Sequence, residues 1–318
     1  MSKLHLVATV AIIGVVLFAQ VPGEEPWAAE LTNFGHGPAF AVLTVLLFRI
    51  LRAQPTWKLP ILAEYAVVVV IALALGAVIE LLQGMIGRDQ SIDDLASDAQ
   101  GTLAAAGFLA MVDPKLQGRG SHRGMRLAGL LLGLAGTTML LWQPIVSSLA
   151  HLDRNRSFPT LADFGRPTSM HFVNALGGAK VRWARLPPSF AGDAGQTHAL
   201  RVDTTARSWW GLLLREPLPD WRHYQRLALT IANPTREPLT LELRVHDQTA
   251  KVDAAAPFAA RLEIEPLSRR TVTVPLDRMT PNGAAARVDL AHVQSLMLAR
   301  KGASRAATEF YVTRLWLE

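Results

Sequence analysis

The 318-residue sequence contains no cysteine. It can therefore form neither a disulfide framework nor a metal site built on thiolates. Three catalytic signatures are also missing: a glycine-rich loop that cradles phosphate, a His-Glu-x-x-His pair and a Gly-x-Ser-x-Gly elbow. The sequence thus gives no motif-level reason to expect a P-loop nucleotidase, a zincin protease or an α/β-hydrolase.

Charge is scarce and balanced in the first half of the chain, where long apolar runs dominate. Residues 1–150 contain nine Lys and Arg against ten Asp and Glu, whereas the remainder contains 23 against 16. The formal net charge of +6 therefore belongs to the second half, where it favours anionic surfaces such as lipid. We predict a membrane domain over 1–150, a polar linker over 151–168 and a water-facing domain over 169–318, and we do not expect a nucleic-acid partner.

Five apolar segments in the first half predict an α-helical membrane bundle. A helix needs roughly 20 apolar residues to cross a bilayer, and the two shorter segments reach that length only as packed members of a bundle. We interpret the first segment as an uncleaved helix rather than a signal peptide, because further spans follow it. The predicted spans are 4–20, 36–52, 61–84, 95–112 and 127–149.

Basic residues alternate with acidic ones from loop to loop, which predicts the orientation. The loop at 20–37 contains three glutamates and no Lys or Arg, whereas the loops at 49–60 and 113–126 contain three and four basic residues. Loops rich in Lys and Arg stay in the cytoplasm. We therefore expect a plasma (inner) membrane protein with a cytoplasmic N-terminus and an extracytoplasmic C-terminal domain.

Polar residues that lack an evident topological role gather near the outer ends of the second, third and fourth predicted spans. Spacings of three and four place Glu80 with Gln83, and Asp94 with Asp98, on shared helix faces. Ionisable groups at membrane depth usually face the bundle interior. The cluster could be a salt-bridge network, a pocket for a ligand head group, or a catalytic site that uses acid–base chemistry and an anion clamp. Its members are His36, Glu80, Gln83, Arg88, Ser91, Asp94 and Asp98.

These residues, followed by Gly101, resemble the pattern of the VanZ-like membrane proteins over about residues 5–112. Two positions depart from that pattern: Asp98 stands where the family usually has Asn, and Thr32-Asn33 stands where it usually has Asp-Lys. The resemblance implies a cell-envelope membrane protein in a family whose founding member is associated with resistance to the glycopeptide antibiotic teicoplanin. It implies no reaction, because the family's biochemical activity is not established.

The second half reads as an all-β antiparallel sandwich, jelly-roll-like in its order of elements. From about Phe172 onward, eight or so short alternating segments are separated by turn signals rich in Pro, Asn, Asp and Gly. Residues 170–318, with the runs 209–247 and 310–318 as the most similar parts, resemble the galactose-binding-like domains of carbohydrate-binding modules. This resemblance implies a glycan ligand.

Aromatic rings can stack on sugars, so Trp209, Trp210, Trp221 and Tyr224 are candidate glycan contacts. Such residues also serve as core packing, and strand alternation turns one of the two adjacent tryptophans inward. Asp220 and the His246-Asp247 pair could supply oxygen ligands to a structural calcium ion. No other metal and no other cofactor is expected.

Three functions are compatible with this reading. The first is a non-enzymatic envelope protein whose bundle takes a lipid-linked or amphiphilic ligand and whose outer domain binds glycan. The second is an enzyme acting on a lipid-linked glycan precursor, and the third is a membrane-anchored scaffold for a partner protein. The first is favoured.

Overall fold

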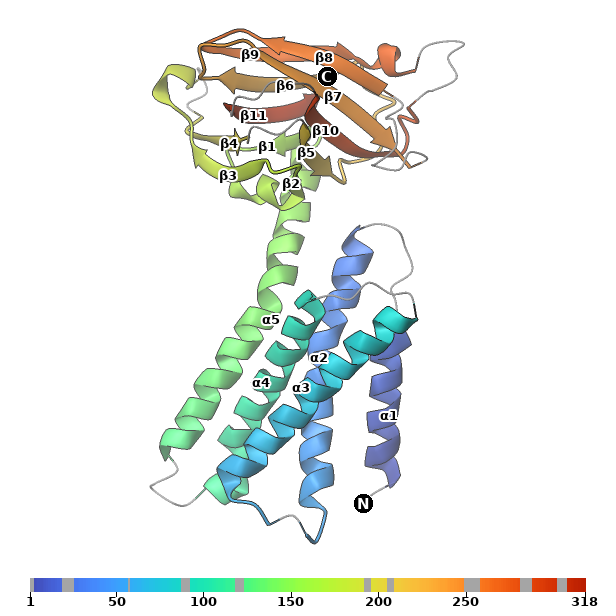
Figure 1. The fold of residues 1–318 in the computed structure, drawn as a ribbon, viewed down its shortest axis with the longest axis vertical. Helices are drawn as coiled ribbons and strands as arrows, with labels where there is room; N and C mark the ends of the chain where they lie inside the picture. The colour runs from blue at the N-terminus through green and yellow to red at the C-terminus, as the bar shows by residue number, and fades with distance from the viewer. Residues whose placement is uncertain are drawn as a thin grey trace. The chain divides into compact units, whose positions relative to one another are not determined.

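The computed structural model describes residues 3–18, 26–56, 58–86, 92–117, 123–191, 196–204, 209–248, 258–280, 288–301 and 308–318. The chain divides into two compact units, Met1–Ile145 and Val146–Glu318 (Figure 1). The first unit is helical, and the second consists mainly of β-strands. Two units of these classes were expected from the sequence.

The helical unit contains six helices in the described residues rather than the five predicted. The additional one is the short 3₁₀ helix η1, whose first turn is capped by the Asp113 carboxylate accepting the backbone N–H of Lys115. Helix α5 begins in this unit and continues into the next. The helices are α1 (Lys3–Phe18), α2 (Pro26–Arg52), α3 (Ile61–Met85), α4 (Ile92–Val112), η1 (Pro114–Leu116) and α5 (Arg123–Ser157).

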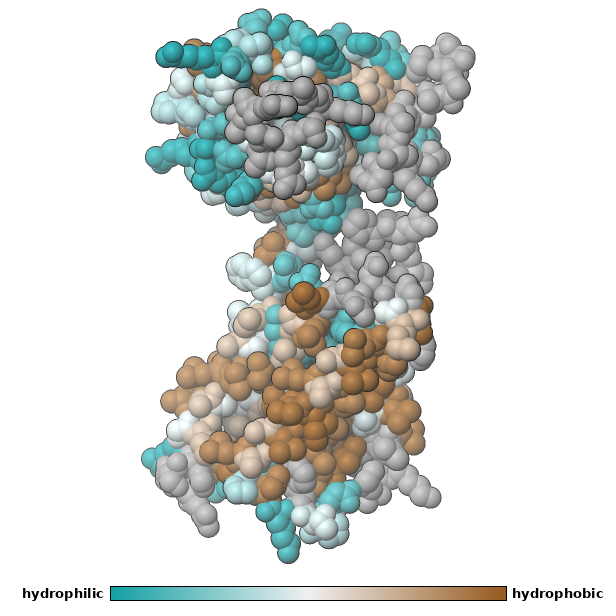
Figure 2. All heavy atoms as spheres, viewed as in Figure 1, coloured by the Kyte–Doolittle hydropathy of each residue, from teal (hydrophilic) through white to brown (hydrophobic). Residues whose placement is uncertain are grey.

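Among the described residues, four helices are long and apolar enough to cross a membrane: α2 from Phe34 onward, α3, α4 and α5. Helix α1, with 16 residues, is not among them. Large apolar side chains lie exposed on α3, where Leu62, Val70 and Leu81 are each more than 60% exposed, and hydrophobic residues cover much of the visible face of this unit (Figure 2). A surface this apolar is typical of contact with lipid or another protein.

Helix α2 begins at Pro26, ten residues before the predicted start of the second span. Proline suits the first turn of a helix, because the N–H that it lacks would have no helical partner there. His36 therefore lies inside a continuous helix and not in the loop before it. Helix α4 likewise starts early, with Asp93 and Asp94 in its first turn, where acidic groups favour the helix dipole.

The predicted linker at 151–168 is regular structure instead. Residues 151–157 form the last two turns of α5, and strand β1 (Thr160–Asp163) and the 3₁₀ helix η3 (Pro167–Phe172) follow. The Asp153 carboxylate holds this segment together by accepting hydrogen bonds from Arg166 Nη1 and Thr168 Oγ1, each at 2.6 Å.

The second unit is a sandwich of two antiparallel sheets, as predicted. The described residues form a sheet with the strand order β3-β4-β11-β6-β9, in which β1 also pairs with β11, and a second sheet with the order β2-β5-β10-β7-β8. The strands after β1 are β2 (Val173–Leu176), β3 (Lys180–Arg185), β4 (His198–Asp203), β5 (Trp209–Arg215), β6 (Arg226–Asn233), β7 (Leu239–Asp247), β8 (Phe258–Ile264), β9 (Ser268–Pro275), β10 (Val293–Lys301) and β11 (Glu309–Leu317), with 3₁₀ helices η4 (Pro188–Phe190) and η5 (Leu276–Met279) between them.

Period-two alternation assigns the faces of the second sheet. On β7, Leu239, Leu241, Leu243 and Val245 all belong to the core between the sheets. Residues 240, 242, 244 and 246 therefore point to the outer face, because successive side chains of a strand alternate. The same rule places Trp210 in the core and Trp209 on the outer face.

Candidate functional site

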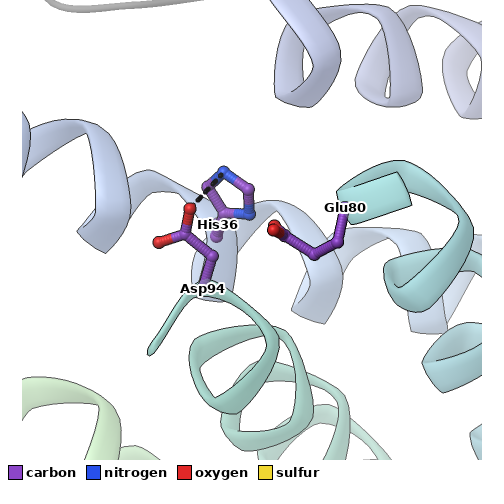
Figure 3. A group of neighbouring side chains, drawn as sticks. All are labelled: His36, Glu80 and Asp94. Atoms are coloured by element: carbon purple, nitrogen blue, oxygen red, sulfur yellow. Dashed lines mark ion pairs between the residues drawn. The ribbon is translucent and has the colours of Figure 1, made fainter. Parts of the chain in front are cut away.

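Four ionisable side chains that the sequence singled out meet inside the helical unit. His36 from α2 points toward Glu80 from α3 and Asp94 from α4 (Figure 3). Its Nδ1 lies 3.2 Å from Asp98 Oδ1, and its Nε2 lies 3.9 Å from Asp94 Oδ2. His36, Glu80 and Asp94 can each offer one ligand atom such that all three atoms lie within 4.8 Å of one another.

Small residues let the three helices approach closely enough for these side chains to converge. A Cβ added to Gly101 of α4 would overlap the carbonyl of Gly37 of α2, and one added to Gly76 of α3 would lie 2.8 Å from Asp98 Oδ2. Glycine at these positions therefore sets the distance between α4 and its neighbours, as small residues do in membrane bundles. Gly101 is the residue that the sequence placed on the same face as Asp94 and Asp98.

The remaining predicted members of the cluster are placed differently. Gln83 is buried on α3, and its Nε2 donates to the carbonyl of Val16 in α1 at 3.0 Å, so it ties two helices together. Arg88 and Ser91 lie outside the described residues. Thr102, which the sequence did not single out, lies one turn after Asp98, is fully buried, and has no hydrogen-bond partner for its hydroxyl among the described residues.

The cluster is closed to solvent. His36 is 3% exposed, Glu80 8%, Asp94 5% and Asp98 0%. A cavity of about 520 Å³ in the helical unit lies elsewhere, between the ends of α2, α3 and α4, lined by Phe48, Arg52, Tyr65 and Asp113 among others. The outward-facing pocket expected for a ligand head group at the cluster thus has no support in the described structure.

A second buried ion cluster borders this cavity, and the sequence did not predict it. Arg52 Nη2 donates to Asp113 Oδ2 at 2.6 Å and pairs with Glu64 Oε2 at 2.7 Å, while Lys115 Nζ lies 2.6 Å from Glu64 Oε1. Tyr65 Oη donates to the same Asp113 oxygen. Burial by itself raises the pKa of Asp113, but its hydrogen bonds from Arg52, from the Lys115 N–H and from Tyr65 outweigh burial and lower the pKa below 3.8. These ion pairs and hydrogen bonds hold together the ends of α2, α3 and α4.

The four aromatic residues proposed as glycan contacts in the β-sandwich differ in how far their side chains are buried. Trp210 is 2% exposed and Trp221 0%, so both rings belong to the core and present no face to a ligand. Tyr224 packs edge-to-face on Phe158, with ring centroids 5.5 Å apart. Only Trp209 of the four lies half-buried on the outer face of a sheet, where it packs with Leu176, Leu213, Met297 and Ala299. This corrects Trp210 and Trp221 from candidate glycan contacts to core residues.

Strand register builds a strip of side chains around Trp209, here named the β5–β10–β7 strip. Trp209 lies at the start of the strip on β5, and successive cross-strand rows then pair Gly211 with Ala299 and Glu242, Leu213 with Met297 and Arg244, and Arg215 with Ser295 and His246. The first rows are apolar at their centre, and the last row is entirely polar. Sequence alone cannot assemble this strip, because it requires the register of three strands that are far apart in the chain.

The polar end of the strip contains donors and acceptors that lack partners in the described structure. Both ring nitrogens of His246, Ser295 Oγ and Arg215 Nε are buried without a hydrogen bond. Burial, together with the nearby Arg244, lowers the pKa of His246 and so favours the neutral imidazole, a form that offers one donor and one acceptor. Buried polar groups are nearly always satisfied, by water where no protein group serves.

Trp183 is an aromatic residue that the sequence analysis missed. It lies on the edge strand β3, is 39% exposed, and stacks on His198 with ring centroids 4.0 Å apart. Its Nε1 donates to the Phe164 carbonyl at 2.9 Å. The candidate glycan contacts named from the sequence were confined to positions 209–224, so Trp183 was not considered.

The residues proposed for calcium do not form one group of free ligands. Asp220 is engaged by the Arg222 guanidinium through two hydrogen bonds, which hold the pKa of the Asp220 carboxyl below its usual range. Asp247 Oδ2 accepts the backbone N–H of Asp289 at 2.8 Å, whereas His246 points to the outer face of the sheet. A structural calcium ion at these positions stays a prediction.

No protein-family model matches the sequence, and no curated protein matches it. The resemblance to VanZ-like proteins accordingly stays a prediction. Among solved structures, an exo-β-agarase is similar over 50% of this chain at 15% identity and a TM-score of 0.40, and the chain spans 24% of the agarase.

Two carbohydrate-binding modules give similar values. A family 11 module of Clostridium thermocellum is 17% identical over 46% of this chain and 86% of its own, with a TM-score of 0.34. The CBM22-1 xylan-binding domain of Paenibacillus barcinonensis Xyn10C is 13% identical over 50% and 94%, also at 0.34. At TM-scores this low, no conclusion about this chain follows from the likeness, and the β-sandwich is established by its own strand pairing.

Proposed function

We propose that this protein is a multi-pass membrane protein of the cell envelope whose β-sandwich binds a glycan on the β5–β10–β7 strip. The observation that carries this proposal is the outer-face position of Trp209 on the same sheet face as a row of polar side chains, several of whose buried atoms lack a hydrogen-bond partner among the described residues. Four helices with the length and composition of membrane spans support the membrane location.

The chemistry of the strip suits a sugar better than it suits a purely apolar ligand. A pyranose has a C–H face that packs on an aromatic ring and an edge of hydroxyls that both donate and accept hydrogen bonds. Trp209 supplies the ring at one end of the strip, and Arg215, Ser295 and neutral His246 supply donors and acceptors at the other. Since the polar row is buried, sugar hydroxyls or bridging waters would need to enter between the side chains that cover it.

The helical unit contributes the anchor and the His36 cluster. In this proposal the helical unit anchors the sandwich beside a lipid-linked or amphiphilic envelope ligand, and the closed His36 cluster joins α2, α3 and α4. An enzyme acting on a lipid-linked glycan precursor is the second candidate, because a histidine flanked by two carboxylates contains the groups for acid–base chemistry. A scaffold for a partner protein is the third.

Retention of the full-length chain on immobilised polysaccharide tests the glycan-binding role. The detergent-solubilised protein should be retained on at least one column of an envelope-glycan panel, and Trp209→Ala should weaken retention about tenfold, the equivalent of roughly 1.4 kcal/mol. Trp183→Ala is the matched control, since it removes an exposed tryptophan from the other sheet and should leave retention unchanged. Equal retention of wild type and Trp209→Ala, or none by either, would refute the proposal.

A further inference from the structure

We infer that His36, Glu80 and Asp94 form a binding site for one divalent transition-metal ion, of the Zn²⁺ or Mn²⁺ class, inside the helical unit. The inference concerns the cluster alone and does not depend on glycan binding by the β-sandwich. The three residues come from α2, α3 and α4, so a shared ion would join three helices at one point.

The separation of the ligand atoms matches a shared ion better than it matches direct hydrogen bonds. His36 Nε2 and Asp94 Oδ2 lie 3.9 Å apart, beyond the 2.7–3.2 Å of a typical hydrogen bond. Metal–ligand bonds of about 2.1 Å allow two ligand atoms on one ion to lie up to about 4.2 Å apart. The Glu80 oxygen falls inside the same 4.8 Å group, so the three side chains would need to move closer together to coordinate one ion.

Asp98 gives an independent indication that His36 binds a metal ion. Histidines that bind metals through one nitrogen usually donate the other N–H to a carboxylate, which fixes the ring and its tautomer. His36 has the geometry for this: its Nδ1 lies 3.2 Å from Asp98 Oδ1, and its Nε2 lies on the side of Asp94.

The second oxygen of Asp98 also supports a metal site. Asp98 is 0% exposed, and its Oδ2 has no hydrogen-bond partner among the described residues. This oxygen lies against Gly76, one helical turn before Glu80 on α3. A buried acceptor of this kind is usually satisfied by water, and a water near the ion would serve.

The chemical types of the ligand atoms determine which class of ion fits the site. One imidazole and two or three carboxylates suit Zn²⁺ and Mn²⁺, whereas Mg²⁺ and Ca²⁺ prefer sites made of oxygen alone. Carboxylates taken out of water are costly, and a divalent ion would add favourable positive charge beside two of them. The near-complete exclusion of solvent also suits an ion better than a head group.

Metal analysis of the full-length chain, purified in detergent without a polyhistidine tag, tests this inference. After stripping with a chelator, the protein is incubated separately with Zn²⁺, Mn²⁺ and Mg²⁺ and desalted, and bound metal is counted by mass spectrometry. About one Zn²⁺ or Mn²⁺ per chain and no retained Mg²⁺ is the expected result. A wild-type chain that takes up neither transition metal would overturn the inference.

Variants locate the ion. His36→Ala, Glu80→Gln and Asp94→Asn should each abolish binding, and Asp98→Asn should keep the stoichiometry but weaken affinity about 10- to 100-fold, as loss of an orienting carboxylate does. Glu64→Gln is the matched control, because Glu64 is a buried glutamate on the same helix that is occupied by Arg52 and Lys115. Metal retained by folded Glu80→Gln and Asp94→Asn would place the ion elsewhere.

X-ray absorption of the Zn²⁺-loaded wild type gives a readout that needs no variant. The expected spectrum shows one imidazole nitrogen and otherwise oxygen ligands at about 2.0–2.2 Å. A spectrum without imidazole, or with several, would contradict the assignment even if each variant failed to fold.

Discussion

Asp113 is the residue whose charge state bears most directly on the stability of the helical unit. It is 3% exposed and joins α2 and α3 to the end of α4 through Arg52 and Tyr65. Because its pKa is lower in the folded protein than the ordinary 3.8, folding favours the ionised form. The stabilisation is fully present above the ordinary value and is lost as the pH falls through the lower folded-state value.

Asp113→Asn should therefore lower the thermal unfolding midpoint at pH 6, by the equivalent of about 2 kcal/mol for lost charge-assisted hydrogen bonds. Its midpoint should also fall less than that of the wild type between about pH 5 and pH 3. Thermal unfolding of both proteins in the same detergent across this range measures the two effects. Parallel acid profiles would show that other groups dominate the acid sensitivity.

At the residue scale, helix periodicity predicted more than strand alternation did. The spacing of Asp94 and Asp98 was enough to place both on the face toward His36, because a helix fixes which residues share a face. The partnership of Arg52 with Asp113, 61 residues later, could not be predicted, since it depends on how two helix ends meet. The row formed by Arg215, Ser295 and His246 could not be predicted either, because it depends on the register of three strands that are far apart in the chain.

At the scale of elements, the α2–α4 contact determines whether the cluster can form. Gly101→Ala places a methyl group on the Gly37 carbonyl, so the helices must separate. We expect a loss of about 3 kcal/mol or more, at the upper end for overpacking, together with loss of the metal binding inferred above.

Gly35→Ala supplies the matched comparison on α2. No described atom lies within 4 Å of a Cβ at Gly35, so the substitution should be neutral or stabilising by about 0.5–1 kcal/mol through reduced backbone entropy. Thermal unfolding in detergent distinguishes the two variants. Similar destabilisation by both would mean that close packing at Gly101 is not the reason for its glycine.

Element boundaries were the least predictable part of the fold. The apolar cores of α2, α3, α4 and α5 follow directly from hydropathy, but polar residues extend α2 back to Pro26 and α5 forward to Ser157. The individual bounds of short strands such as β2 and β3 were not predicted, because segments of four to six residues carry too few alternating positions. The sandwich itself was predictable, since later strands of seven to nine residues alternate clearly.

For the whole molecule, the proposed topology separates the loop around Lys58 from the β-sandwich by α3, α4 and α5. Each of these three helices has the length and composition of a membrane span. An odd number of crossings places Lys58 and the sandwich on opposite sides of the membrane, whether or not α1 also crosses. In the proposed topology, the positive-inside rule assigns the Lys58 side to the cytoplasm.

Single-cysteine labelling tests this topology without background, because the chain has no cysteine of its own. Arg236→Cys, in an exposed turn between β6 and β7, should react with a membrane-impermeant maleimide in intact spheroplasts, whereas Lys58→Cys, also exposed, should react only after permeabilisation. Ser2→Cys then shows whether α1 crosses the membrane. If Ser2→Cys is labelled from the same side as Lys58→Cys, both α1 and α2 cross. If it is labelled from the same side as Arg236→Cys, α1 does not cross. If Lys58→Cys and Arg236→Cys are labelled from the same side, the number of crossings between them is even, so α3, α4 and α5 do not all span the membrane. The proposed extracytoplasmic position of the sandwich would then be wrong.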